Sequence, residues 1–263
     1  MRITSLLYHD VIENGDFRES GFNGIGPDSY KLNLSNFKSH LKVSAPKLAK
    51  QGILFTDFLS GRNTDLKNLR LITFDDGGIS FLTRIAPLLE SYHATGVFFV
   101  ATGFLGSNGF LNAGQVRELH DRGHIIGSHS HSHPKIISNL SYHDLIHEWK
   151  TSKEILSEII GEEVMVASVP GGYYSRQVGQ SAEESGFKML FTSEPTIKVT
   201  KLGNCYVAGR YSIKQGDPPA KAAKIFNHNP VFFAREFLYW NMKKLLKNSL
   251  GSNYLKIREK LLK

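Results

Sequence analysis

The sequence of 263 residues has little of what stabilises small secreted domains or repetitive fibres. It contains one cysteine, so it can form neither an internal disulfide nor a cysteine-based zinc site. The 9 prolines are few and the 24 glycines follow no period, which excludes a collagen-like or low-complexity chain. Hydrophobic residues make up 41% of the sequence, too many for a chain that is disordered throughout. A single α/β barrel, which typically takes roughly 250 residues, fits this length best.

Long apolar runs are also missing. No stretch approaches the ~18 uninterrupted apolar residues of a membrane-spanning helix. The first residues lack the apolar core and the small-residue cleavage site of a signal peptide. We therefore expect a cytoplasmic protein.

Basic residues exceed acidic ones, and most of the excess lies near the end of the sequence. The net charge is +8, and residues 231–263 carry eight Lys and Arg against two Glu, a net charge of +6, interleaved with aromatic residues and leucines. This composition suits a helix lying at a membrane surface, here the inner surface, or two helices packed on the barrel with a solvated basic side. No nucleic-acid module is recognisable, so we expect no nucleic acid partner. The expected organisation is a barrel over 1–230 and a basic, aromatic-rich helical tail over 231–263.

Apolar segments typical of strands alternate with helical patterns. Such alternation predicts crossover units around a parallel sheet, and seven or eight strands in this length favour a closed or nearly closed barrel. The expected strands are Ile3–Tyr8, Leu71–Phe74, Gly96–Ala101, His124–Ser128, Val164–Ser168, Lys188–Thr192 and Tyr206–Ile213.

Polar clusters follow four of these strands. They are His9, the segment 75–78 (DDGG), the segment 129–134 (HSHSHP) and the segment 170–174 (PGGYY). Parallel α/β barrels carry their active sites at the carboxyl ends of their strands. The four clusters therefore predict one site on one face of the barrel.

Asp75 and Asp76 are adjacent carboxylates directly after a buried strand. They could form a solvated turn, since Asp-Gly is a common turn pair. Alternatively they divide the work, one binding a cation and the other acting as a base. The two glycines that follow would let the backbone turn tightly and approach a ligand closely.

Three histidines alternate at 129, 131 and 133. A polar loop that happens to contain histidines is the simpler explanation. Neutral imidazoles are also zinc ligands, and two of them with one carboxylate form a catalytic rather than a structural metal site. Three histidines within five residues, beside the Asp pair, favour the metal site.

Two segments resemble motifs of the NodB-type polysaccharide deacetylases, carbohydrate esterase family 4. The string 73–77 (TFDDG) is similar to the first motif of that family, and His129-Ser130-x-x-His133-Pro134 is similar to the second. The strand at 94–100 and the spacing between the motifs match as well. The resemblance covers about residues 70–195 and extends loosely to the segment 8–10 (YHD).

The resemblance implies a distorted, incomplete (β/α) barrel of about seven parallel strands, NodB-like and related to the TIM barrel. It implies that Asp75 is the general base, and that Asp76, His129 and His133 hold one divalent cation, usually zinc and in some members cobalt or nickel. The backbone N–H of Gly171 would stabilise the oxyanion. Tyr173 and Tyr174 could stack on a sugar or simply pack at the barrel rim.

The sequence departs from the family in two places. Ser168 stands where the third motif often has an arginine that orients the base, and Arg176 or Arg210 could replace it. The histidine that acts as general acid is not recognisable. His9, His131 and Glu194 are unranked candidates for that role.

Taken together, the resemblance implies a metal-dependent hydrolase that removes N-acetyl groups from an amino-sugar-containing polysaccharide or a lipid-linked glycan precursor. A hydrolase of a non-sugar amide or imide is one alternative. A catalytically weak carbohydrate-binding homologue is another. The sugar, the linkage and the oligomeric state are not indicated by the sequence.

Overall fold

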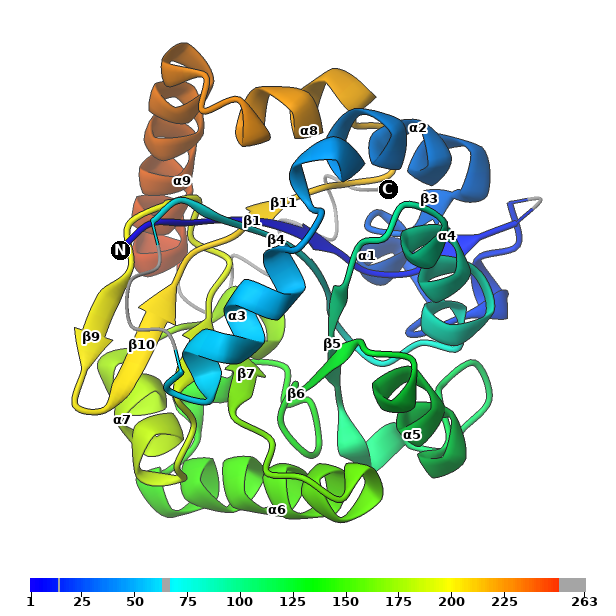
Figure 1. The fold of residues 1–263 in the computed structure, drawn as a ribbon. Helices are drawn as coiled ribbons and strands as arrows, with labels where there is room; N and C mark the ends of the chain where they lie inside the picture. Colours follow the sequence, from blue (N-terminus) through cyan, green and yellow to red (C-terminus); the bar gives the residue numbers. More distant parts are fainter. Residues whose placement is uncertain (14, 63–66, 251–263) are drawn as a thin grey trace.

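The computed structural model describes residues 1–13, 15–62 and 67–250, and it shows one curled sheet surrounded by helices (Figure 1). The strands are β1 (Ile3–Tyr8), β4 (Leu69–Phe74), β5 (Gly96–Val100), β6 (Ile125–Ser128), β7 (Val166–Ser168), β8 (Met189–Phe191), β9 (Thr200–Leu202), β10 (Cys205–Ala208) and β11 (Tyr211–Ser212). Their order in the sheet is β11-β1-β4-β5-β6-β7-β8-β10-β9. Every pair is parallel except β9 with β10. The expected incomplete barrel of mostly parallel strands is confirmed.

The two ends of this sheet meet at one short segment. Ala208 of β10 pairs with Phe191 of β8, and three residues later Tyr211 of β11 pairs with Leu6 of β1. Three residues span at most about 11 Å, so β8 and β1 must curl toward each other. The single strand expected over Tyr206–Ile213 is therefore two strands with a break at 209–210, and this break enters the site described below.

The helices cover the outside of the sheet and end at recognisable signals. They are α1 (Ile25–Asp28), α2 (Leu34–Ser44), α3 (Gln51–Leu59), α4 (Ala86–Ser91), α5 (Ala113–Asp121), α6 (Tyr142–Ile160), α7 (Arg176–Glu184), α8 (Pro219–Phe226) and α9 (Pro230–Leu250). The Ser141 hydroxyl accepts a hydrogen bond from the Asp144 N–H at the start of α6, and Gly161 ends that helix in the left-handed conformation. A small parallel pair, β2 (Val11–Ile12) and β3 (Leu32–Asn33), lies apart from the main sheet.

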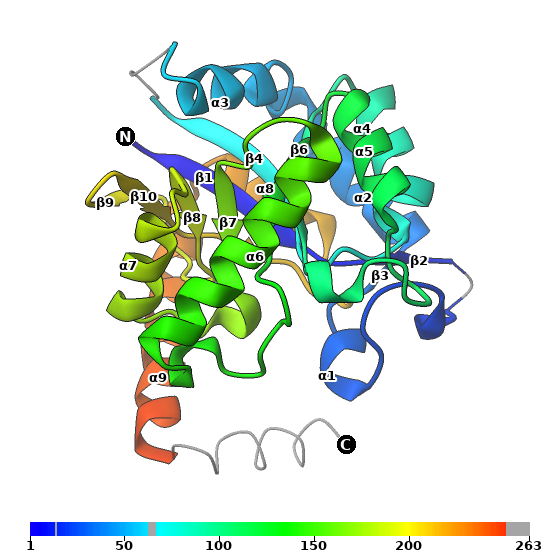
Figure 2. The ribbon, with the colours of Figure 1, turned by 90° about the horizontal axis from the view of Figure 1, so that it is seen from below.

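Both faces of the sheet are buried, which explains the nearly continuous apolar strands. Along β5, Val97 and Phe99 pack in the barrel interior, while Phe98 and Val100 pack against the outer helices. Helix α3 adds Phe55 to the interior cluster, next to residues at the amino ends of β1 and β4. This helix lies on the upper side of the molecule in Figure 2 and closes one end of the barrel. The opposite end of the barrel, formed by the carboxyl ends of the strands, carries the candidate site described below.

Helix α9 is attached at its beginning and then projects from the body (Figures 1 and 2). Phe232 is buried, and the ring of Phe233 stacks on Tyr211 of β11 with centroids 5.0 Å apart. Residues 251–263 of the predicted tail lie outside the described residues. Among the helices of the described part of the chain, none combines the length and the apolar character needed to cross a bilayer.

Candidate metal and catalytic site

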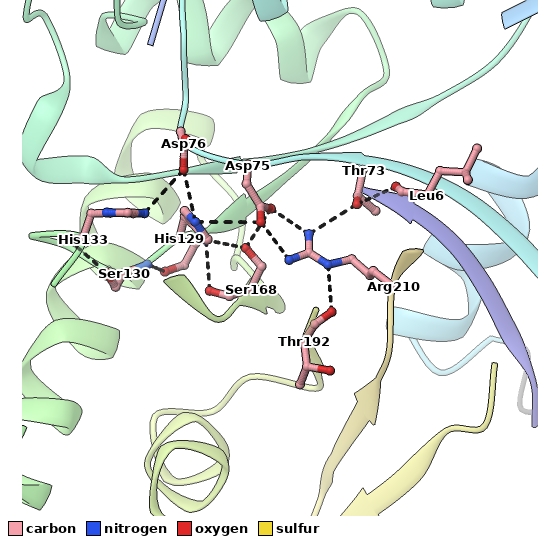
Figure 3. A network of polar contacts seen from close by, with 11 residues as sticks. Leu6, Thr73, Asp75, Asp76, His129, Ser130, His133, Ser168, Thr192 and Arg210 are labelled. Carbon is pink, nitrogen blue, oxygen red and sulfur yellow. Dashed lines mark hydrogen bonds and ion pairs between the residues drawn. The ribbon is translucent and has the colours of Figure 1, made fainter. Parts of the chain in front are cut away.

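One carboxylate and two imidazoles converge at the carboxyl ends of β4 and β6. His129 Nε2 lies 3.3 Å and His133 Nε2 lies 3.4 Å from the same oxygen, Asp76 Oδ1 (Figure 3). The three candidate ligand atoms all lie within 4.8 Å of one another. Burial alone would raise the pKa of Asp76, but the neighbouring imidazoles of His129 and His133 hold that pKa well below its usual range. Asp76 is therefore ionised and can bind a cation.

The orientation of His129 leaves Nε2, the ring nitrogen that faces Asp76, available to bind a metal ion. Its Nδ1 lies 3.1 Å from the backbone oxygen of Ser168, and a carbonyl can only accept, so Nδ1 carries the proton and donates. In the neutral imidazole Nε2 then has a free lone pair, and it is Nε2 that faces Asp76. A backbone partner on the far nitrogen is the usual support of a metal-binding histidine. The donor set of Asp76, His129 and His133 therefore fits a divalent cation such as zinc.

The loops that carry these ligands are held in uncommon backbone conformations. Asp76, Ser130 and His133 have φ values of 90°, 63° and 52°, in a region that residues with side chains rarely adopt. Such conformations persist only where the surroundings fix them, and they cluster at functional sites. The Ser130 hydroxyl accepts a hydrogen bond from the His133 N–H at 3.2 Å, which fixes the turn between the two histidines.

Glu148 of α6 fixes the backbone of the same loop through hydrogen bonds. Its carboxylate accepts hydrogen bonds from the N–H groups of His131 (2.9 Å) and Ser132 (2.8 Å) and from the Ser132 hydroxyl (2.6 Å). The side chain is nearly fully buried, so these bonds replace its contacts with water. The sequence does not identify Glu148, because one carboxylate on an amphipathic helix carries no recognisable signal.

Asp75 has a different partner from its neighbour. Arg210, which is fully buried, donates from its two terminal nitrogens to the two oxygens of Asp75 at 2.6 and 2.7 Å. The guanidinium also donates to the Thr192 carbonyl and the Thr73 hydroxyl. Burial alone would raise the pKa of Asp75, but Arg210 above all lowers it, so the carboxylate is ionised.

Arg210 comes from the break between β10 and β11. Of the two arginines considered as replacements for the family's third-motif arginine, it is the one that contacts Asp75, whereas Arg176 lies on the exposed first turn of α7. Ser168, which occupies the motif position itself, donates its hydroxyl to Asp75 at 3.1 Å and lies 2.5 Å from His129 Nδ1. Ser168 thus contacts both Asp75 and the candidate metal ligand His129 (Figure 3).

Gly78, the second glycine after the Asp pair, has a structural explanation. A Cβ on Gly78 would lie 1.9 Å from Asp10 Oδ1, so the close approach observed there is to a buried carboxylate of the protein. Asp10 accepts hydrogen bonds from the hydroxyls of Ser20 (2.5 Å) and Ser80 (2.7 Å), and burial raises its pKa to about 6. Asp10 therefore ties the segment after β1 to the loop after β4.

A cavity of about 1100 Å³ opens above Asp75, Asp76, His129 and His133. Of the other residues singled out in the sequence, His9, Gly171 and Tyr173 line it, whereas His131, Glu194 and Tyr174 do not. The wall also includes four residues of α9 that the sequence did not identify, namely Arg235, Glu236, Tyr239 and Trp240.

The sequence matches a known family over about half its length. Residues 62–190 match the polysaccharide deacetylase family. The chain is 28% identical over 162 residues to the peptidoglycan-N-acetylmuramic acid deacetylase PdaA of Bacillus subtilis, in an alignment that covers 60% of this chain and 59% of that protein. The aligned regions span 44% to 59% of the length of the first curated relatives.

Solved structures of deacetylases share the fold. The Streptococcus pyogenes deacetylase PplD, in complex with acetate, superposes with a TM-score of 0.67 at 22% identity, covering 84% of this chain and 96% of that one. A polysaccharide deacetylase from Bacillus cereus gives a TM-score of 0.69 at 18% identity, covering 86% of this chain and 69% of that one. At such identities the likeness shows the fold alone. The match of residues 62–190 identifies this half of the chain as a polysaccharide deacetylase domain.

Proposed function

We propose that this protein is a metal-dependent hydrolase that removes N-acetyl groups from an amino sugar in a polysaccharide or a lipid-linked glycan precursor. The observation that carries the proposal is the pairing of two adjacent carboxylates with different partners, Asp76 with two imidazoles and Asp75 with Arg210. A mere binding protein has no need of an ionised carboxylate beside a metal site. The cavity above them has room for sugar units.

Asp76, His129 and His133 would hold the cation. When bound, a divalent cation supplies Lewis-acid polarisation of the amide carbonyl and makes the attacking water more acidic. The protein fixes the geometry of the ligands in two ways. The Ser168 carbonyl orients the ring of His129, and Glu148 holds the backbone of the loop between His129 and His133.

Asp75 is the proposed general base. Its Oδ1 accepts hydrogen bonds from both Arg210 and Ser168. Its Oδ2 accepts one hydrogen bond from Arg210 and keeps a further lone pair, so Oδ2 can accept a proton from the attacking water. Asp75 Oδ2 lies 3.8 Å from His129 Nε2, which places the base directly beside the candidate cation ligands. Arg210 holds the carboxylate ionised and in one orientation.

The backbone N–H of Gly171 is the proposed oxyanion donor. Gly171 lies in the turn after β7 with a φ of 61° and lines the cavity. Tyr173 covers Gly171, since a Cβ there would lie 3.2 Å from the tyrosine ring.

His9 is the proposed source of the proton for the leaving amine. Apart from the two candidate ligands, it is the one histidine that lines the cavity, and its ring lies 4.7 Å from that of Tyr30. Its buried Nδ1 has no hydrogen-bond partner within the part of the chain that the structure describes. Burial lowers the pKa of His9, so the ring is neutral at rest. A neutral imidazole can donate from one nitrogen while the other accepts, which suits a proton relay.

The test is acetate release from defined N-acetylated glycans. Oligomers of N-acetylglucosamine, with and without N-acetylmuramic acid, are incubated with protein that has been stripped by a chelator and then reloaded with zinc, cobalt or nickel. We expect acetate and a free amine only with reloaded protein, and no product with Asp76→Asn. Asp121→Asn, an exposed aspartate of α5, is the matched control. Glycan binding without acetate release, with every metal tested, would instead identify a carbohydrate-binding homologue.

A further inference from the structure

Helix α9 carries a line of exposed apolar side chains. Val231, Leu238, Met242 and Leu245 are each 61% to 77% exposed and recur at spacings of seven, four and three residues. These spacings place them in one line along the helix, which we call the outer stripe. Phe237 is also largely exposed. Contiguous exposed apolar surface of this kind marks a contact site rather than ordinary surface composition.

The opposite side of α9 is already used by the protein. Phe232 is buried, Phe233 stacks on Tyr211, and Glu236 and Trp240 line the cavity. The helix is therefore anchored by its first turn and forms a wall of the cavity without any contribution from the outer stripe. The outer stripe is therefore exposed and can contact a surface outside the protein.

Charge indicates which surface this is. Residues 231–263 carry a net charge of +6, whereas the preceding 230 residues together carry +2. An apolar stripe within a basic segment, beside a partly exposed tyrosine, is the pattern of a helix that lies in the interface of an anionic bilayer. A contact between two copies of the chain would bring two such basic segments together and would be opposed by their repulsion.

We propose that α9 docks the protein on an anionic lipid surface through the outer stripe. Arg235, Glu236, Tyr239 and Trp240 of the same helix line the cavity, so docking holds the cavity next to the headgroup layer. Helix α1, which also contributes to the cavity lining, lies on the same lower side of the molecule as the end of α9 in Figure 2. The proposal does not rest on the deacetylase function, because lipid binding is measured without turnover.

The experiment is vesicle flotation of the full chain. Vesicles of phosphatidylcholine alone are compared with vesicles that also contain phosphatidylglycerol, at low and at high salt. The test variant is Leu238→Gln with Met242→Gln, which removes the centre of the outer stripe. The matched control is Ile53→Gln with Leu54→Gln on α3, where both residues are exposed and α3 lies on the upper side in Figure 2. Thermal unfolding of all three proteins verifies that they fold alike.

We expect the wild type to float with phosphatidylglycerol vesicles at low salt and less at high salt, since exposed charges are screened. The stripe variant should lose about tenfold or more of its partitioning, because two large side chains no longer enter the apolar layer. The control should bind like the wild type. Unchanged binding of the stripe variant would overturn the proposal. So would a dimer that the same two substitutions convert to a monomer while neither protein binds vesicles, since a second copy would then cover the stripe.

Discussion

The cavity joins two regions that are held in place by different forces. Its floor lies at the strand ends, where Asp75, Asp76 and His129 are at most 7% exposed and each makes charged or hydrogen-bonded contacts. Its outer wall is α9, which is attached through Phe232 and Phe233 and exposes most of its remaining described side chains.

The difference predicts two kinds of mutational effect. Removing one partner of a buried ion pair typically costs about 3–5 kcal/mol, because the other charge stays buried without compensation. Surface substitutions usually stay within about 0.5 kcal/mol. We therefore expect substitutions in the floor to abolish chemistry and substitutions in α9 to alter only binding. The following experiments test this contrast, from the largest expected effect to the smallest.

Asp75→Asn should give the largest loss. The amide keeps the shape of the side chain but cannot accept the proton of water, and loss of a general base typically costs about 10²- to 10⁴-fold in rate. Metal content, measured by atomic emission, should stay near the wild-type value because Asp76, His129 and His133 are unchanged. If the metal is lost together with activity, the two aspartates have been assigned the wrong roles.

Arg210→Met should lower activity and also change its pH dependence. Arg210 lowers the pKa of Asp75, and burial alone raises that pKa. A base works only when ionised, so the variant should lose activity at a higher pH than the wild type as the solution is acidified. The profile of kcat/KM against pH measures this shift. Arg176→Met is the matched control. An equal shift in that variant would contradict the conclusion that Arg210 sets the pKa of Asp75.

Glu148→Ala should weaken metal binding while leaving the ligands in place. Loss of a group that supports metal ligands typically costs 10- to 100-fold in affinity, and we expect about tenfold because Glu148 holds the loop backbone rather than an imidazole. Competition with a chromophoric chelator gives the zinc affinity without any catalytic assay. Glu154→Ala, an exposed position on the same helix, should bind zinc like the wild type.

Trp240→Ala should have the smallest effect and should act on KM alone. Its side chain lines the cavity from α9. The lost aromatic contact is worth roughly 0.5–1 kcal/mol, which is about a two- to fivefold rise in KM. Steady-state kinetics on one soluble oligosaccharide separates KM from kcat, with the exposed Phe237→Ala as control. A large fall in kcat would show that the wall takes part in the chemistry.

The sequence allows prediction of those parts of the site that are local in the chain. Asp76, His129 and His133 follow predicted strands, and the parallel topology brings strand ends to one face, so their convergence could be expected. Arg210 could be named only as one of two candidates, because it lies 135 residues from Asp75 and sits at a strand break that composition does not show. Helix α3 was not predicted either, since it begins after Lys50 without a capping side chain.

The orientation of α9 is another feature that lies beyond the sequence. Apolar and basic residues alternate along residues 231–250, and this mixture is compatible with packing on the barrel and with exposure. The structure combines the two, since the first turn packs on Tyr211 while the outer stripe is exposed. Which residues of such a helix are buried depends on where the rest of the chain places it.

The break between β10 and β11 has a consequence for how the chain folds. Asp75 and Arg210 are brought together by the segment that links the two ends of the sheet, after most of the intervening chain has been arranged. Contacts between residues so distant in sequence form late, because the entropy of closing a long loop must first be offset by other contacts. A folding intermediate would therefore hold the Asp75 carboxylate without Arg210 and open to water. We expect activity to emerge only in the last phase of refolding, after most of the helical signal has returned.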